Sequence, residues 1–269
     1  MEDKIMDLTQ LKIGFIGFGN MAEAIAEGWI LSNKIQADQL YASARDQEKL
    51  AHKTESLGIH AVETNRKLVK LVDIIILAVK PHQIDKMISP LKEVLRGKIV
   101  VSVAVNYLYE DFDKILSVDT QHLSTLPNTP VAFGDGVFLF EDKHSLADQN
   151  FSIIQSLFQL ISHVELIPTE QMAIAGIITG SAPAFVDLFI EALGDAAVKH
   201  GLDRKTAYRL TSQMMSGTAN LQLKTGKHPG ELKDQITSPG GTTIKGIASL
   251  EKNAFRGTII EAVDEILKD

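Results

Sequence analysis

Hydrophobic positions in the first half of the chain fall into short uninterrupted runs, which are separated by stretches with a helical period. The run at 73–79 reads Asp-Ile-Ile-Ile-Leu-Ala-Val and is apolar on both faces, which is typical of a central strand in a parallel sheet. Similar runs predict further strands at 12–16, 40–43, 59–62, 98–103, 121–124 and 137–140. Because strands that alternate with helices are joined by right-handed crossovers, this half is predicted to form a doubly wound, mostly parallel α/β sheet.

The hydrophobic pattern changes after about Pro168, where helical periodicity replaces almost every strand signal. Long helices are predicted at 184–200, 204–224 and 254–268. The domain boundary is therefore expected between His163 and Thr169. It divides the chain into an α/β domain over residues 1–167 and an all-helical domain over residues 168–269.

A glycine-rich turn joins the first predicted strand to a helix that carries Ile25, Ala26 and Trp29 on one face. The turn fits the pattern G-x-G-x-x-G/A and consists of Gly17, Phe18, Gly19, Asn20, Met21 and Ala22. In this pattern the first glycine permits a tight turn, and the second lets a pyrophosphate approach the backbone. The unpaired N–H groups at the start of the helix suit an anion. The turn predicts a Rossmann-type dinucleotide site, and a glycine turn that binds nothing is the alternative.

The end of the second predicted strand indicates which nicotinamide cofactor is bound. An NAD-binding strand usually ends in an acidic residue that accepts a hydrogen bond from the ribose 2′-hydroxyl. This strand ends in Ser43-Ala44-Arg45 and has no acid there. Ser43 and Arg45 are therefore expected to hold a 2′-phosphate, which favours NADPH over NADH. NADH remains the less favoured alternative, in which Arg45 is a solvated loop residue.

Two more strand ends are expected to face the same crevice, because ligands of open α/β sheets bind at the carboxyl ends of the strands. The fourth predicted strand ends in Ala78, Val79, Lys80 and Pro81, and the fifth runs into Ala104. A structural surface role for Lys80 is equally compatible with the sequence.

The segment 238–243 is the most informative one in the helical half. It consists of Ser238, Pro239, Gly240, Gly241, Thr242 and Thr243. A turn that leads into a helix start presents free backbone N–H groups, which suit a carboxylate. An ordinary capped loop between helices is the alternative.

Charge and composition exclude several classes of function. The 269 residues carry a formal net charge of −7, so no overall positive field attracts nucleic acid. The absence of cysteine excludes disulfides, thiolate metal ligands and a cysteine nucleophile. The eight histidines are scattered without ligand spacing, so no metal site is predicted.

The sequence shows neither a signal peptide nor an uncharged run of about 20 apolar residues that would span a bilayer. The longest uncharged run, 171–186, is interpreted as a buried helix pair. We expect a soluble, cytoplasmic protein that acts on a small molecule and contacts neither membrane nor nucleic acid.

Four motifs together resemble those of the pyrroline-5-carboxylate reductase family. They are Gly-Phe-Gly-Asn-Met at 17–21, Ala-Val-Lys-Pro at 78–81, Pro-Asn-Thr-Pro at 127–130 and Ser-Pro-Gly-Gly-Thr-Thr at 238–243. The resemblance covers nearly the whole chain, and its last motif, together with 228–234 before it, is highly specific. It implies transfer of a hydride from NADPH to the C=N bond of 1-pyrroline-5-carboxylate. The product is L-proline, and the reaction is the last step of proline biosynthesis.

The resemblance also implies roles for particular residues. Backbone amides of 238–243 would bind the substrate carboxylate, and Thr243 would hydrogen-bond the ring nitrogen. Asn65 would lie near the cofactor ribose, and Ala78 to Pro81 would lie along the cofactor. The helical domain would interleave with that of a second copy to form a homodimer, which in this family is often assembled further into a decamer.

The chain departs from the family pattern at three places and leaves two other functions open. The family usually has arginine at Ser124, glycine at Ala182, and Ala-Gly at Val105-Asn106. One alternative is an NADPH-binding paralogue with weak catalysis and a sensing or regulatory role. The other is a related cyclic-imine or β-hydroxyacid reductase. The β-hydroxyacid enzymes use a lysine on the first long helix of the second domain, and residues 169–198 contain none.

Overall fold

The computed structural model describes residues 8–268. The chain divides into two compact units, one that ends at Gly180 and one that begins at Ser181. The first unit has an α/β architecture and the second is helical, so the predicted fold class is confirmed.

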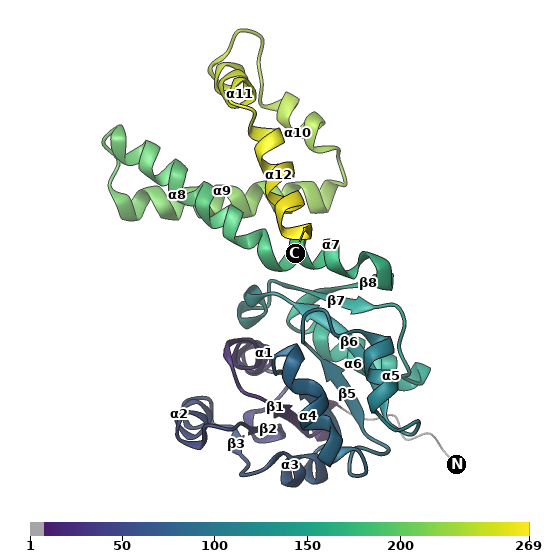
Figure 1. Ribbon diagram of the computed structural model, residues 1–269. Coiled ribbons are helices and arrows are strands. Elements are labelled where there is room, and N and C mark those ends of the chain that lie inside the picture. Colours follow the sequence, from purple (N-terminus) through teal and green to yellow (C-terminus); the bar gives the residue numbers. More distant parts are fainter. Residues whose placement is uncertain (1–7, 269) are drawn as a thin grey trace. The chain divides into compact units, whose positions relative to one another are not determined.

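The first unit is built on one sheet, whose strand order within residues 8–268 is β3-β2-β1-β4-β5-β6-β7-β8 (Figure 1). Its strands are β1 (Ile13–Ile16), β2 (Leu40–Ser43), β3 (His60–Ala61), β4 (Ile74–Leu77), β5 (Ile99–Ser102), β6 (Gln121–Pro127), β7 (Gly136–Glu141) and β8 (Ser162–Ile167). Its helices are α1 (Asn20–Leu31), α2 (Gln47–Leu57), α3 (Asn65–Leu71), α4 (Ile84–Ile88), α5 (Tyr109–Ile115), α6 (Asp148–Gln159) and α7 (Met172–Gly176). Neighbouring strands are parallel except for β6 and β7, which are antiparallel. The sheet is therefore mostly parallel, as predicted.

Every predicted strand is present, although β3 is reduced to two residues. The sequence reading missed β8, in which His163 and Glu165 point to solvent while Ser162 and Val164 are buried. Alternating polar residues on so short a strand leave a weak apolar signal, which explains the omission. This strand crosses the segment in which a domain boundary was expected.

Consecutive residues of the central strands serve two separate cores, one on each face of the sheet. Ile74 and Ile76 of β4 pack on the face covered by α1 and α6, whereas Ile75 and Leu77 pack on the face covered by α3, α4 and α5. The predicted apolar face of α1 is buried, and the indole Nε1 of Trp29 donates to the carbonyl of Leu157 at 3.0 Å. Burial on both faces of β4 is the reason that its run carries no polar residue.

The second unit consists of α8 (Pro183–Lys199), α9 (Arg204–Thr225), α10 (Pro229–Gln235), α11 (Thr242–Lys252) and α12 (Phe255–Leu267). Helices α8 and α9 pack on each other, and a Cβ added at Gly194 would lie 2.4 Å from the ring of Tyr208. The three long predicted helices are confirmed, and α10 was not predicted. Its seven residues begin with Pro229 at the first helical position, and the side chain of His228 accepts the N–H of Gly230.

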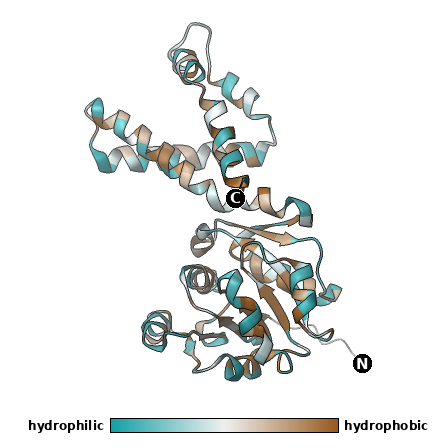
Figure 2. Cartoon of the chain, viewed as in Figure 1, coloured by the Kyte–Doolittle hydropathy of each residue, from teal (hydrophilic) through white to brown (hydrophobic). Residues whose placement is uncertain are grey.

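Many apolar side chains of the second unit are exposed in the single chain, and Figure 2 shows apolar residues along its helices. The exposed set includes Val186, Leu188, Leu210, Met214, Leu221, Leu223, Leu250, Phe255, Ile259 and Ile260. The interpretation of 171–186 as a buried helix pair is therefore wrong for one chain taken alone. Of its residues, Met172 and Ile177 are buried, whereas Ile178 and Val186 are exposed. A set of this size predicts contact with another apolar surface.

The helical stretch from Thr169 to Lys199 is long and apolar enough, by length and composition alone, to cross a membrane. Its most apolar window has a mean hydropathy of 1.7, and 6% of that window is buried. A single stretch of this kind is weak evidence for a membrane span, because an apolar helix face that meets a protein partner has the same composition.

Candidate active site

A cleft of about 1200 Å³ lies at the carboxyl ends of β1, β2, β4 and β5. All of the predicted cofactor residues line it, namely Gly17, Phe18, Gly19, Asn20, Met21, Ala22, Ser43, Arg45, Asn65, Ala78, Val79, Lys80, Pro81 and Ala104. The sequence reading missed further lining residues, which include Asp46, Lys49, His82, Lys86, Val105 and Thr129. Residues from separate strand ends are thus gathered around one cleft, as expected for a dinucleotide site at the edge of a parallel sheet.

The glycine turn is held between its two neighbouring strands. Gly17 has a φ of +86°, and a Cβ added there would lie 2.5 Å from the carbonyl oxygen of Ala78. The N–H of Gly17 donates to the carbonyl of Ser43 at 2.8 Å, so the turn is attached to the end of β2 as well. Only glycine fits this position without strain, which is the role predicted for the first glycine of the motif.

The remaining small residues of the turn leave room for an anion. A Cβ added at Gly19 would meet no protein atom within 4 Å, so this glycine faces open space. Gly19 is the N-cap of α1, and no side chain caps the first N–H groups of that helix. Ala22 is fully buried against the sheet. The open space and the uncapped N–H groups together fit a pyrophosphate.

At the end of β2, the buried residue Ser43 is followed by charged, exposed side chains. Ser43 is 1% exposed, whereas Arg45 lies on the surface of the cleft. The acid that lines this end, Asp46, is the N-cap of α2 and accepts the N–H of Lys49 at 3.0 Å. This acid therefore stands three residues after the last residue of β2 and not at the strand end itself, and one of its oxygens caps the helix.

Two of the three departures from the family pattern are conformationally conservative. Asn106 has a φ of +56°, a left-handed conformation that glycine and asparagine adopt at low cost. Ala182 has ordinary helical angles, φ −63° and ψ −19°, so no glycine is required there. Ser124 differs, because its hydroxyl is buried and has no hydrogen-bond partner within residues 8–268.

The predicted substrate loop belongs to the second unit. Gly240 has a φ of +70°, and the N–H of Gly241 donates to the carbonyl of Ser238 at 3.0 Å. Gly241 is the N-cap of α11, and no side chain caps the N–H groups that follow in Thr242 and Thr243. A Cβ added at Gly241 would lie 2.4 Å from the hydroxyl of Ser238 and 3.2 Å from its carbonyl oxygen, so a larger residue there would displace the Ser238 side chain. The arrangement offers several unpaired donors to one carboxylate.

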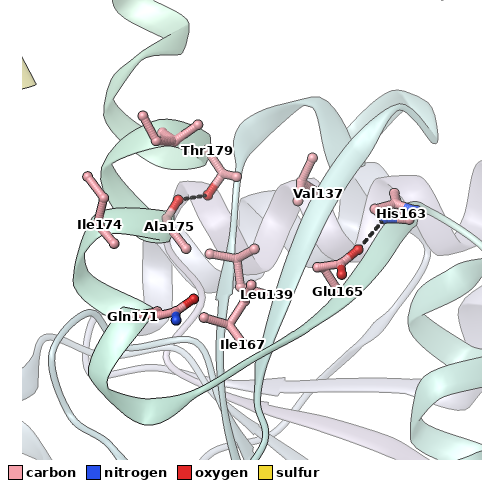
Figure 3. Close-up of a pocket in the computed structure, with 10 residues that line it drawn as sticks. Val137, Leu139, His163, Glu165, Ile167, Gln171, Ile174, Ala175 and Thr179 are labelled. Atoms are coloured by element: carbon pink, nitrogen blue, oxygen red, sulfur yellow. Dashed lines mark hydrogen bonds and ion pairs between the residues drawn. The ribbon is translucent and has the colours of Figure 1, made fainter. Parts of the chain in front are cut away.

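A second, smaller hollow of about 330 Å³ lies between β7–β8 and α7 with the π-helical turn Ile177–Ser181 (Figure 3). Its lining is mostly apolar and includes Val137, Leu139, Ile167, Ile174 and Ile178. His163 and Glu165 also line it, and Nε2 of His163 lies 2.8 Å from a carboxylate oxygen of Glu165, within hydrogen-bond distance. The hollow shares no lining residue with the cleft.

In a comparison with protein families, the N-terminal and C-terminal parts of the chain match two different families. Residues 12–106 match a family described as NADP oxidoreductase, coenzyme F420-dependent. Residues 169–269 match the family described as pyrroline-5-carboxylate reductase dimerisation.

Individual relatives match over nearly the full length. The pyrroline-5-carboxylate reductase of Treponema pallidum is 40% identical over 257 residues, which cover 94% of this chain and 97% of that protein. The Escherichia coli protein of the same name is 34% identical, with 96% of both chains covered. The solved structure of Plasmodium falciparum pyrroline carboxylate reductase with NADP bound has a TM-score of 0.87 and 30% identity, and 96% of each chain is covered.

Proposed function

The chain belongs to the pyrroline-5-carboxylate reductase family, and we propose how its residues carry out that reductase activity in proline biosynthesis. The cofactor is NADPH. When bound, NADPH supplies a hydride for the C=N bond of 1-pyrroline-5-carboxylate, which gives L-proline. The protein's task is to bind and orient both molecules.

The cofactor is held by the residues of the cleft. The N–H groups at Gly19 and the start of α1 bind the pyrophosphate, because no side chain competes for them. Ser43 and Arg45 bind the 2′-phosphate, and Asn65 binds a ribose. Segment 78–81 and Ala104 form the wall along which the nicotinamide half lies. The observation that carries this assignment is the convergence of all the predicted residues on one cleft.

The substrate carboxylate is bound by the N–H groups of Gly240, Thr242 and Thr243. Gly241, whose own N–H donates to Ser238, shapes the turn, and the substrate also contacts Ser238 and Pro239. The Thr243 hydroxyl hydrogen-bonds the ring nitrogen and orients the C=N bond. A protonated imine already accepts hydride readily at its carbon, so the nitrogen needs no further proton from a strong general acid. This agrees with a loop that presents hydroxyl and N–H groups rather than an acid–base pair.

The dimerisation region supports a homodimer, and the exposed apolar residues of α8, α9 and α12 provide the surface for it. A partner at this surface also accounts for the apolar stretch Thr169–Lys199 without a membrane. We assign residues 1–167 to cofactor binding and 168–269 to dimerisation and substrate binding. Assembly into a decamer and a cytoplasmic location complete the proposal. Analytical ultracentrifugation distinguishes dimer from decamer.

The test of the activity is the fall in absorbance at 340 nm when protein, NADPH and pyrroline-5-carboxylate are mixed. Oxidation of NADPH with stoichiometric proline is expected, and a parallel sample with NADH gives the cofactor preference. NADPH binding without oxidation would favour the sensing paralogue instead.

A further inference from the structure

We propose that Lys49 is a second cationic contact for the 2′-phosphate of NADPH and that, with Arg45, it determines the preference for NADPH over NADH. The inference rests on the proposed function of the cleft. It concerns a residue that the cofactor motifs do not include.

The backbone places Lys49 at the adenosine-ribose end of the cleft. The end of β2 is attached to the glycine turn by the bond from Gly17 to Ser43, so residues after Ser43 lie beside the predicted pyrophosphate site. Asp46 caps α2 by accepting the N–H of Lys49, which fixes Lys49 in the first turn of that helix. Lys49 lines the cleft together with Ser43 and Arg45.

Lys49 is free to contact a ligand, whereas the next lysine on the same helix face, Lys53, is already paired. Lys53 lies four residues later and therefore on the same side of α2. It forms an ion pair with Glu23 of α1 at 2.5 Å, and its side chain is only 13% exposed. This pair joins α2 to α1 and so fixes the face of α2 that carries Lys49. Within residues 8–268, neither Lys49 nor Arg45 has an ion-pair partner.

The charges at this end support a role for the lysine. Arg45 and Lys49 are two cations beside the carboxylate of Asp46, which leaves one net positive charge among these three lining residues. A phosphate monoester carries a charge of roughly −1.5 to −2 at neutral pH. Without Lys49 the charges of Arg45 and Asp46 cancel, so these two neighbours would offer the phosphate no net positive charge. NADH has a hydroxyl in place of the phosphate and does not depend on this balance.

The test compares dissociation constants of NADPH and NADH for wild type, Lys49→Gln, Lys49→Arg and Lys34→Gln. Lys34→Gln is the matched control, because it removes the same charge from an exposed position of the same unit outside the cleft. Lys49→Gln is expected to weaken NADPH binding about tenfold, the size of one charge-assisted hydrogen bond, and to leave NADH binding unchanged. Lys49→Arg is expected to restore most of the loss, and Lys34→Gln to have no effect.

Competition with nucleotide fragments isolates the phosphate. Adenosine 2′,5′-bisphosphate is expected to lose affinity for Lys49→Gln, and 5′-AMP to keep it. Equal losses for NADPH and NADH, or no loss for the bisphosphate, would overturn the assignment of Lys49. Because these are binding measurements, they decide the role of Lys49 even if the wild-type protein fails to reduce pyrroline-5-carboxylate, which would refute the proposed function alone.

Discussion

Alanine at Gly17 and alanine at Gly19 are expected to have opposite effects, although the two glycines are separated by one residue. At Gly17 the new methyl group would lie 2.5 Å from the Ala78 oxygen and 2.7 Å from Cγ1 of Val79, at a φ of +86°. Left-handed strain and overpacking together cost about 2–5 kcal/mol of unfolding free energy. The midpoint of thermal unfolding should then fall by roughly 5–15 °C.

At Gly19 the same substitution meets no protein atom within 4 Å, and the φ of −88° suits any residue. The unfolding free energy should change by less than about 0.5 kcal/mol. The methyl group would instead occupy the space proposed for the pyrophosphate and displace it from the N–H groups of α1. Loss of one such bond to a charged group weakens NADPH binding by about 10–100-fold.

Thermal unfolding followed by circular dichroism and NADPH titration followed by fluorescence measure the two quantities. Gly97→Ala serves as the control, because Gly97 has a φ of +72° with no atom within 4 Å of its added Cβ. It should lose about 1–2 kcal/mol from left-handed strain alone and keep its NADPH affinity. Wild-type NADPH affinity in Gly19→Ala would refute the pyrophosphate site. Wild-type stability in Gly17→Ala would refute the close approach of β1 and β4 at this turn.

Three further predictions concern specificity, chemistry and pH. Arg45→Ala should raise the Michaelis constant for NADPH far more than that for NADH, and equal rises in steady-state kinetics would contradict the 2′-phosphate contact. Thr243→Val should lower kcat/KM for pyrroline-5-carboxylate by about tenfold or more, the size of one hydrogen bond to a charged group, and an unchanged value would remove Thr243 from the mechanism. Burial lowers the pKa of His122, and it lowers the pKa of His144 in the same direction. Their neutral forms therefore stabilise the fold above a pH of about 6.5, and this stability is lost as the pH falls below that value. In denaturant unfolding, His122→Leu should show a shallower loss of stability between pH 6.5 and 5 than wild type, as roughly one titrating group is removed.

The local pattern along the chain was sufficient for the elements that make the cleft. The apolar run of β4, the glycine turn and the polar end of β2 each depend on residues close in sequence, so their roles could be predicted from periodicity and turn chemistry. The missed elements are those that carry only a weak apolar pattern. β8 is buried on alternate residues only, and α10, which begins at Pro229 after the cap His228, buries none of its seven residues.

The same limit applies to single residues. The departure at Asn106 looked like a lost glycine, and only its φ of +56° shows that asparagine keeps the conformation. The apolar run 171–186 was expected to be buried, but the exposure of Ile178 and Val186 shows that a single chain does not cover it. Apolar composition alone does not reveal whether the covering surface comes from the same chain.

The sequence by itself determined which residue types stand at each strand end and at the substrate loop, because glycine conformation, strand periodicity and helix starts are local properties. Only the tertiary structure decided which side chains remain available to a ligand. Lys49 and Lys53 are equivalent in the sequence, and an ion pair to Glu23, 30 residues away, engages the second and leaves the first beside the cleft. That distinction arises from the packing of α2 on α1, which depends on the strand order of the sheet and on no pattern within α2 itself.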